Sequence, residues 1–201
     1  MLKLPWAFDK NEWFVLGSML CLLVCFIAIP KIMPRGMTLS VLLYFAVLGF
    51  TADVLVGVDY PIDFYTIMDS PKLELFDVLV YLINYPIFGY FLSYLLYKYE
   101  MRKKPLFFLI PLWCGLSVLF EFISAKLKVF TYHNGWNLGY SALTYPFIFS
   151  LSAAVIELYI RIWESRGSQK ERPDRPAQNS RKDDGPDHEK NDFARKRFGH
   201  H

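Results

Sequence analysis

Residues 118–141 read VLFEFISAKLKVFTYHNGWNLGYS, and this stretch decides how the chain folds. It begins in an apolar segment that carries one acid, Glu121, and it leaves that segment through a short polar loop. It then enters a second apolar segment at Tyr140. Two long apolar segments joined by a polar turn are typical of a pair of helices that cross a membrane.

The composition of the whole chain supports this interpretation. Of its 201 residues 54% are hydrophobic, whereas soluble domains have about 45–50% on a count that includes glycine. The excess lies in residues 1–164, because residues 165–201 contain hardly any large apolar side chains. The net charge of +3 also comes from residues 165–201, so no basic surface for nucleic acid is expected in the remainder.

Five apolar runs near twenty residues long follow one another along the chain. They predict an all-α membrane protein, a bundle of five transmembrane helices in residues 1–164. Residues 165–201 cannot bury enough apolar surface to fold alone, so we expect a disordered charged tail. The expected partners are the lipid bilayer and either a second copy of the chain or another membrane protein. The five expected spans cover about residues 13–29, 38–57, 75–97, 105–125 and 138–163.

Basic residues predict the orientation of the bundle. With five spans, the tail lies on the same side as the turn at 30–36 and the loop at 98–104, and these three segments hold most of the Lys and Arg outside the spans. The positive-inside rule then places the N-terminus outside and the C-terminus in the cytoplasm.

This orientation brings several polar residues to a similar depth near the outer side. A charged side chain inside a membrane costs about 2.5–3.5 kcal/mol on insertion scales, so such residues usually face the interior of the bundle or a wet cavity. Helical spacing places Asp77 and Asn84 on one face of the third span. The candidate polar cluster comprises Asp53, Asp77, Asn84, Glu121 and His133.

Structural explanations also fit these residues. Lys126 or Lys128 could reach back to neutralise Glu121 in an ion pair. Asp53 and Asp77 lie near the ends of their spans, where headgroups could solvate them. Glu157 has Arg161 one helical turn later, which favours an i,i+4 pair at the membrane interface.

The loop after the fourth span contains further candidate contacts. His133, Asn134 and Gly135 first of all predict a turn, because Asn-Gly favours a positive φ. Trp136 and Tyr140 are typical of aromatic anchors at a membrane interface, and they are the alternative candidates, with Asn134, for contacts to a ligand.

A weak internal repeat is also present. Tyr85-Pro86 and Tyr145-Pro146 fall in the third and fifth spans, which run in the same direction. The span before each carries an acid near its outer end, Asp53 and Glu121 respectively. Paired broken helices can mark the binding site of a transporter, although proline is also common in membrane helices that bind nothing.

No complete catalytic motif, phosphate-binding loop or metal-binding pattern is found. The three cysteines, Cys21, Cys25 and Cys114, all lie in apolar runs, so neither a disulfide framework nor a zinc site is expected. Three functions remain open, with no cofactor expected for any of them. The first, which we prefer, is a non-catalytic role in envelope structure, sensing or assembly. The second is a transporter or a binder of small molecules or ions, and the third is an enzyme that uses Glu121 or Asp77 as acid or base.

Four short segments carry a resemblance to known proteins, and they are Phe120-Glu121-Phe122, residues 129–132, Gly135-Trp136-Asn137 and Tyr140-Ser141. With them the chain resembles a family of small multi-pass membrane proteins from Bacillus- and Clostridium-type bacteria, and the similarity extends over most of residues 37–163. That family has no assigned activity. The resemblance implies a multi-pass protein of the bacterial plasma membrane and adds no mechanism.

Overall fold

The structure is a computed structural model that describes residues 8–56, 64–68, 75–99 and 106–170. It contains five helical segments that are long and apolar enough to cross a membrane. The chain divides into two compact units, Met1–Glu164, which holds these segments except for the end of the last helix, and Ser165–His201. The segments are α1 (Lys10–Ala28), α2 (Arg35–Val56), the continuous run α3 (Leu75–Leu79), η1 (Val80–Asn84) and α4 (Tyr85–Lys98), then α5 (Leu106–Lys126) and α6 (Leu138–Lys170).

Local sequence signals explain where several helices begin and end. Asp9 and Glu12 form a capping box at the start of α1, in which Glu12 Oε2 accepts a hydrogen bond from the Asp9 N–H at 2.8 Å. This cap starts α1 three residues before the predicted span. Pro30 ends it, because a proline cannot continue the hydrogen-bond ladder. The last helix, α6, continues to Lys170, beyond the predicted end at residue 163.

The third span contains one turn of π-helix, η1, immediately before Pro86. The Tyr85 N–H donates to the Val80 carbonyl, five residues back instead of four. Pro86 has no N–H for the carbonyl of Leu82 and its ring crowds that oxygen, so a wider turn accommodates it. Proline alone does not require this turn, because α6 stays α-helical around Pro146.

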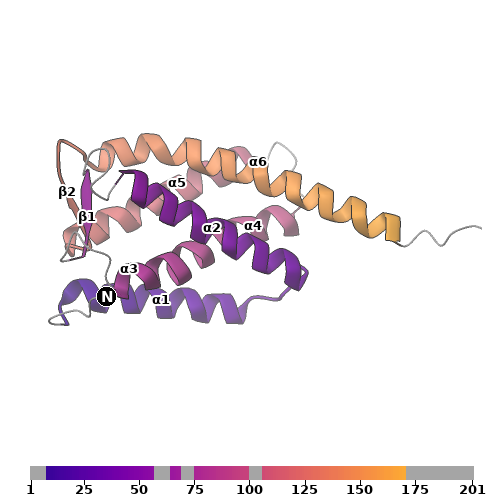
Figure 1. The fold of residues 1–201 in the computed structure, drawn as a ribbon, viewed down its shortest axis with the longest axis horizontal. Coiled ribbons are helices and arrows are strands. Elements are labelled where there is room, and N and C mark those ends of the chain that lie inside the picture. Colours follow the sequence, from indigo (N-terminus) through magenta and orange to yellow (C-terminus); the bar gives the residue numbers. More distant parts are fainter. Residues whose placement is uncertain (1–7, 57–63, 69–74, 100–105, 171–201) are drawn as a thin grey trace, which may run out of the picture. The chain divides into compact units, whose positions relative to one another are not determined.

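The expectation of an all-α fold was wrong in one respect, because two short strands form a sheet. They are β1 (Tyr65–Ile67) and β2 (Phe130–Tyr132), which pair antiparallel with Tyr65 opposite Tyr132. Figure 1 shows the strands at the end of the bundle where α2 and α5 end. The sheet therefore joins the segment that follows α2 to the segment that follows α5.

The buried residues form two apolar clusters. The larger one includes Met37, Tyr90 and Leu92, which are fully buried, and it packs α2 and α4 together with α5 and α6. The smaller one packs α1, α3 and η1 against the strands through residues such as Val15, Val80 and Val129. Large apolar side chains cover much of the outside of the helices, as expected for surfaces that face lipid. Examples on α1, α2 and α6 are Ile27, Leu39 and Leu143.

Two local predictions are confirmed. Arg161 donates to the Glu157 carboxylate one turn earlier in α6. Asn134 and Gly135 both have positive φ, 47° and 82°, in the turn where the Trp136 N–H donates to the His133 carbonyl at 2.9 Å. The loop at 98–104 and the tail at 165–201, on which the predicted orientation and the predicted disorder depend, lie largely outside the described residues.

Candidate binding cavity

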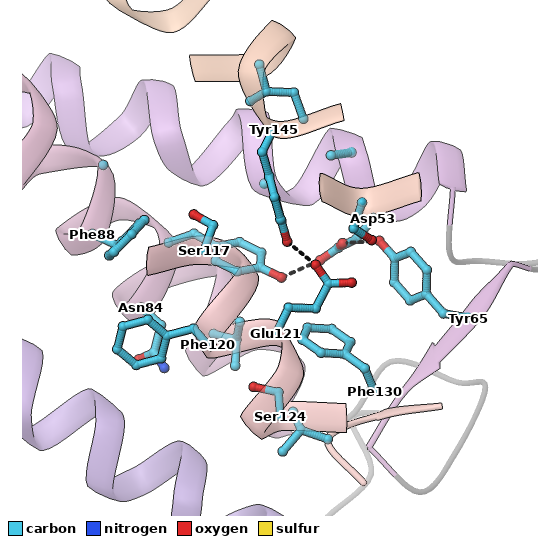
Figure 2. Close-up of a pocket in the computed structure, with 18 of the residues that line it drawn as sticks. Asp53, Tyr65, Asn84, Phe88, Ser117, Phe120, Glu121, Ser124, Phe130 and Tyr145 are labelled. Carbon is cyan, nitrogen blue, oxygen red and sulfur yellow. Dashed lines mark hydrogen bonds between the residues drawn. The ribbon is translucent and has the colours of Figure 1, made fainter. Parts of the chain in front are cut away.

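A cavity of about 300 Å³ lies inside the bundle, and all five helical segments and both strands contribute to its wall. Its lining is mostly apolar and aromatic, and two acids, Asp53 of α2 and Glu121 of α5, interrupt it. Figure 2 shows the carboxyl groups of these two residues facing the same space. Both side chains are buried, with 5% and 7% of their surface exposed.

Two tyrosine hydroxyls hold the carboxylate of Asp53. The hydroxyl of Tyr65, in β1, donates to Oδ1, and that of Tyr85, at the start of α4, donates to Oδ2 at 3.2 Å. Each oxygen of this carboxylate thus has a tyrosine donor, and Tyr81 of η1 also hydrogen-bonds the carboxylate. A buried carboxylate without such donors would be strongly disfavoured, so the tyrosines stabilise the acid in its position.

The carboxylate of Glu121 is held in the same way. Tyr132, in β2, donates to Oε1 at 2.8 Å, and Tyr145, in α6, donates to Oε2. The ion pair considered from the sequence is replaced by these hydrogen bonds, because Lys126 Nζ lies over the Phe122 ring, 5.6 Å from its centroid. The other lysine considered, Lys128, has a φ of 61° in the turn that follows α5.

The same arrangement therefore occurs twice. In each half of the bundle one helix supplies an acid, the next strand supplies a tyrosine, and the next helix supplies a second tyrosine followed by proline. The strand tyrosines follow their acids by 12 and 11 residues. They also lie opposite each other in the sheet, so the sheet connects the two halves at the site.

A glycine in α2 leaves room for one of these tyrosines. A Cβ added at Gly49 would overlap the Cδ2 atom of Tyr85. Gly49 precedes Asp53 by one helical turn, on the stripe of small residues that the sequence shows along the second span. Because Gly49 has no side chain, the Tyr85 ring packs directly against α2 at this position, and its hydroxyl reaches Asp53.

A second polar contact ties the cavity wall to α1. The Ser18 hydroxyl donates to the Val15 carbonyl at 2.9 Å, so its oxygen is left to accept from Asn84 Nδ2, also at 2.9 Å. This chain of donors fixes the orientation of the Asn84 amide. The opposite end of the amide, Oδ1, is buried and accepts no hydrogen bond from the described residues.

Further polar groups on the wall come from α5 and α6. Ser117 and Ser124 share a face of α5 with Glu121, as helical spacing predicts. Trp136 also lines the cavity, and its indole N–H donates to the Ser141 hydroxyl at 3.1 Å. Trp136 is therefore more than an anchor at the membrane surface.

Of the predicted polar cluster, Asp53, Asn84 and Glu121 line the cavity together, and Asp77 and His133 lie outside it. Asp77 is buried near the start of α3. His133 bonds Thr66 across the sheet, with 2.8 Å between Nε2 and Oγ1. Of the loop candidates, Asn134 lies in the turn, and Tyr140 is exposed and packs its ring at a tilt against Trp136.

Sequence reasoning missed the four tyrosines that bind the acids. Tyr85 and Tyr145 were noticed only for the prolines that follow them. Tyr65 and Tyr132 lie in strands of three residues, too short for a periodic pattern to reveal. The available signal was the similarity of the segments Tyr65-Thr66-Ile67 and Phe130-Thr131-Tyr132, both rich in residues that favour strands.

Burial and the neighbouring acids keep the strand tyrosines protonated. Burial, together with the charge of Asp53, raises the pKa of Tyr65 well above its ordinary value of 10.0. Burial and the hydrogen bond to Glu121 raise the pKa of Tyr132 in the same direction. Both hydroxyls are therefore donors throughout the physiological range of pH.

The cavity offers acceptors and aromatic faces to a ligand. None of the described residues that line it is Lys, Arg or His. No group of three or more His, Cys, Asp or Glu in the described ranges is placed to hold a metal ion. An apolar cavity with a few convergent polar groups is the usual form of a site for a small molecule.

Comparison with models of protein families, with curated proteins and with solved structures finds no match to this chain. The function is therefore argued from the cavity itself.

Proposed function

We propose that this protein is a multi-pass membrane protein that binds a small molecule in the cavity around Asp53 and Glu121, without chemical change to the ligand. The observation that carries the proposal is the convergence of two buried acids from separate helices on one apolar cavity. Buried acids are costly inside a membrane, and four tyrosine donors are arranged to hold these two in place. Stability alone does not call for such an arrangement, because an apolar core of the same volume would be at least as stable.

This proposal joins two of the three functions considered from the sequence, sensing and ligand binding. The third, an enzyme with Glu121 or Asp77 as its acid or base, has less support. Asp77 does not line the cavity, and both oxygens of Glu121 already accept hydrogen bonds from tyrosine.

We further infer the orientation of the protein in the bacterial plasma membrane from its basic residues. With the N-terminus outside, the strands and the cavity beside them lie toward the outer surface. A ligand would then enter from outside the cell or from the outer leaflet.

Binding can be measured with 1-aminoanthracene, a neutral aromatic dye whose fluorescence increases in apolar surroundings. The purified full chain in detergent micelles should give a saturable increase above that of empty micelles. The Ser117→Phe variant should lose it, because the new ring would fill the cavity next to Glu121.

Gly115→Phe is the matched control on the same helix. A Cβ added at Gly115 lies in open space with no neighbouring atom within 4 Å, and Gly115 does not line the cavity, so this variant should bind the dye as the wild type does. Equal dye binding by the wild type and the Ser117→Phe variant would show that the dye does not bind in the cavity. The absence of any saturable binding would refute the proposed function.

A further inference from the structure

We propose that the ligand of this cavity is an organic ammonium ion with an apolar body. This inference rests on the proposed function, because it names the chemical class of the molecule bound in the same cavity. It follows from three properties of the wall: its charge, its free hydrogen-bonding positions and its aromatic lining.

The charge of the wall is unbalanced. Asp53 and Glu121 face the same space, while the described lining contains no Lys, Arg or His to offset them. Two like charges in an apolar cavity repel each other and lose the hydration that water gives them. A ligand that carries one positive charge would offset the repulsion and replace part of the lost hydration.

The free hydrogen-bonding positions on the two carboxylates are acceptors. Each of the four carboxylate oxygens receives one tyrosine hydroxyl, and a carboxylate oxygen can accept about two hydrogen bonds. Tyr81 also donates a hydrogen bond to Asp53, so at least three of the four oxygens keep one position for a donor from the ligand. The four phenolic protons are already used, so the wall has few donors left for an anionic or carbonyl-bearing ligand.

Aromatic rings surround this acidic centre. Phe45, Phe88, Phe120 and Phe149 line the apolar part of the cavity, and the faces of such rings attract cations as well as apolar groups. At about 300 Å³ the cavity is at the lower end of the range for drug-sized ligands. Its size suits a single apolar body with one charged end better than a lipid with two acyl chains.

Three molecules of nearly equal size and shape test the charge directly. They are 4-phenylbutylamine, which is a cation at pH 7, the neutral 4-phenylbutan-1-ol and the anion 4-phenylbutanoate. Each competes with 1-aminoanthracene on the full-length protein in a non-ionic detergent. The amine should displace the dye at a concentration about ten-fold lower than the alcohol, the gain expected of hydrogen bonds to a charged group, and the carboxylate should displace it least.

The double variant Asp53→Asn, Glu121→Gln shows whether the acids cause this preference. These amides keep the shape of the acids, and the amine should displace the dye from this variant no better than the alcohol does. Glu157→Gln removes an acid outside the cavity and should keep the wild-type ranking.

The possible results separate the inference from the proposed function. Dye binding with equal displacement by amine and alcohol would overturn the ammonium ligand and leave small-molecule binding intact. A preference for the amine that survives in the double variant would also overturn it, because the acids would then not be responsible. The comparison of amine and alcohol on the wild-type protein does not depend on any variant. It can therefore contradict the inference even if the double variant folds poorly. If phosphatidylethanolamine, which has two acyl chains, displaced the dye at the same concentration as 4-phenylbutylamine, the ligand would not be limited to molecules with a single apolar body.

Discussion

The glycine at position 49 shows how one residue controls the site. Gly49→Ala would place a methyl group where the Tyr85 ring now crosses α2, so the ring must move away from Asp53. We expect a loss of about 1–3 kcal/mol in the free energy of unfolding, the usual cost of overpacking, and weaker binding of 1-aminoanthracene. Thermal unfolding in detergent measures the first effect and the dye titration the second.

Gly17→Ala provides the comparison, because a Cβ at Gly17 meets nothing within 4 Å. That variant should be as stable as the wild type or slightly more stable, since alanine is the better helix former. If the two variants behaved alike, the contact between Gly49 and Tyr85 would have no role in the site.

The raised pKa values of Tyr65 and Tyr132 should make the folded protein less stable at alkaline pH. The pKa values of Tyr65 and Tyr132 are raised in the folded protein, so the folded state keeps protons that the unfolded chain releases above pH 10. The stabilisation is complete below pH 10 and is lost as the pH rises beyond it. The melting temperature of the wild type should therefore fall between pH 9 and pH 11.

The double variant Tyr65→Phe, Tyr132→Phe should be less stable at pH 8, because each acid loses one donor, but its further loss between pH 9 and pH 11 should be smaller. Tyr99→Phe, which changes an exposed tyrosine, should follow the wild-type curve. Parallel curves for the wild type and the double variant would show that these hydroxyls do not link pH to stability.

At the scale of elements, the π-turn η1 distinguishes the two halves of the bundle. Asn84 of η1 bonds Ser18 of α1, whereas Thr144, just before Tyr145, donates to the Tyr140 carbonyl of its own helix at 2.8 Å. The bond to α1 and the missing N–H of Pro86 together favour the wider turn. That turn sets the direction in which Asn84 and Tyr85 face the cavity.

Pro86→Ala restores an N–H and should let η1 return to a regular α-helix, which would rotate Asn84 and Tyr85 along the wall. We expect about a five-fold loss of affinity for 1-aminoanthracene, the equivalent of one hydrogen bond of about 1 kcal/mol. Pro146→Ala is the matched control, because α6 is already regular there. If both substitutions changed the affinity for the dye equally, the π-turn η1 would have no specific role in binding.

The helices could be predicted from the sequence because apolar runs of the necessary length are strong local signals. Ser117, Glu121 and Ser124 all line the cavity, and their common face follows from helical spacing alone. The sheet and its tyrosines could not be predicted, because the pairing of Tyr65 with Tyr132 depends on two loops that meet only in three dimensions. The hydrogen-bond partners of Glu121 could not be predicted for the same reason, since they come from β2 and α6, whereas the sequence suggested an ion pair with a nearby lysine as one alternative.

At the scale of the whole molecule, the predicted orientation decides from which side a ligand reaches the cavity. The described loop between α5 and α6 should lie outside the cell and the end of α6 inside it. Thr131, in β2, and Glu164, near the end of the span, are both exposed and suit a labelling experiment. A membrane-impermeant maleimide should label Thr131→Cys in intact cells and should label Glu164→Cys only after the cells are permeabilised. Both variants are made in a background without Cys21, Cys25 and Cys114, whose unlabelled protein measures non-specific reaction. The reverse pattern would place the N-terminus in the cytoplasm and the acids near the inner surface, so that the ammonium ligand would have to come from inside the cell.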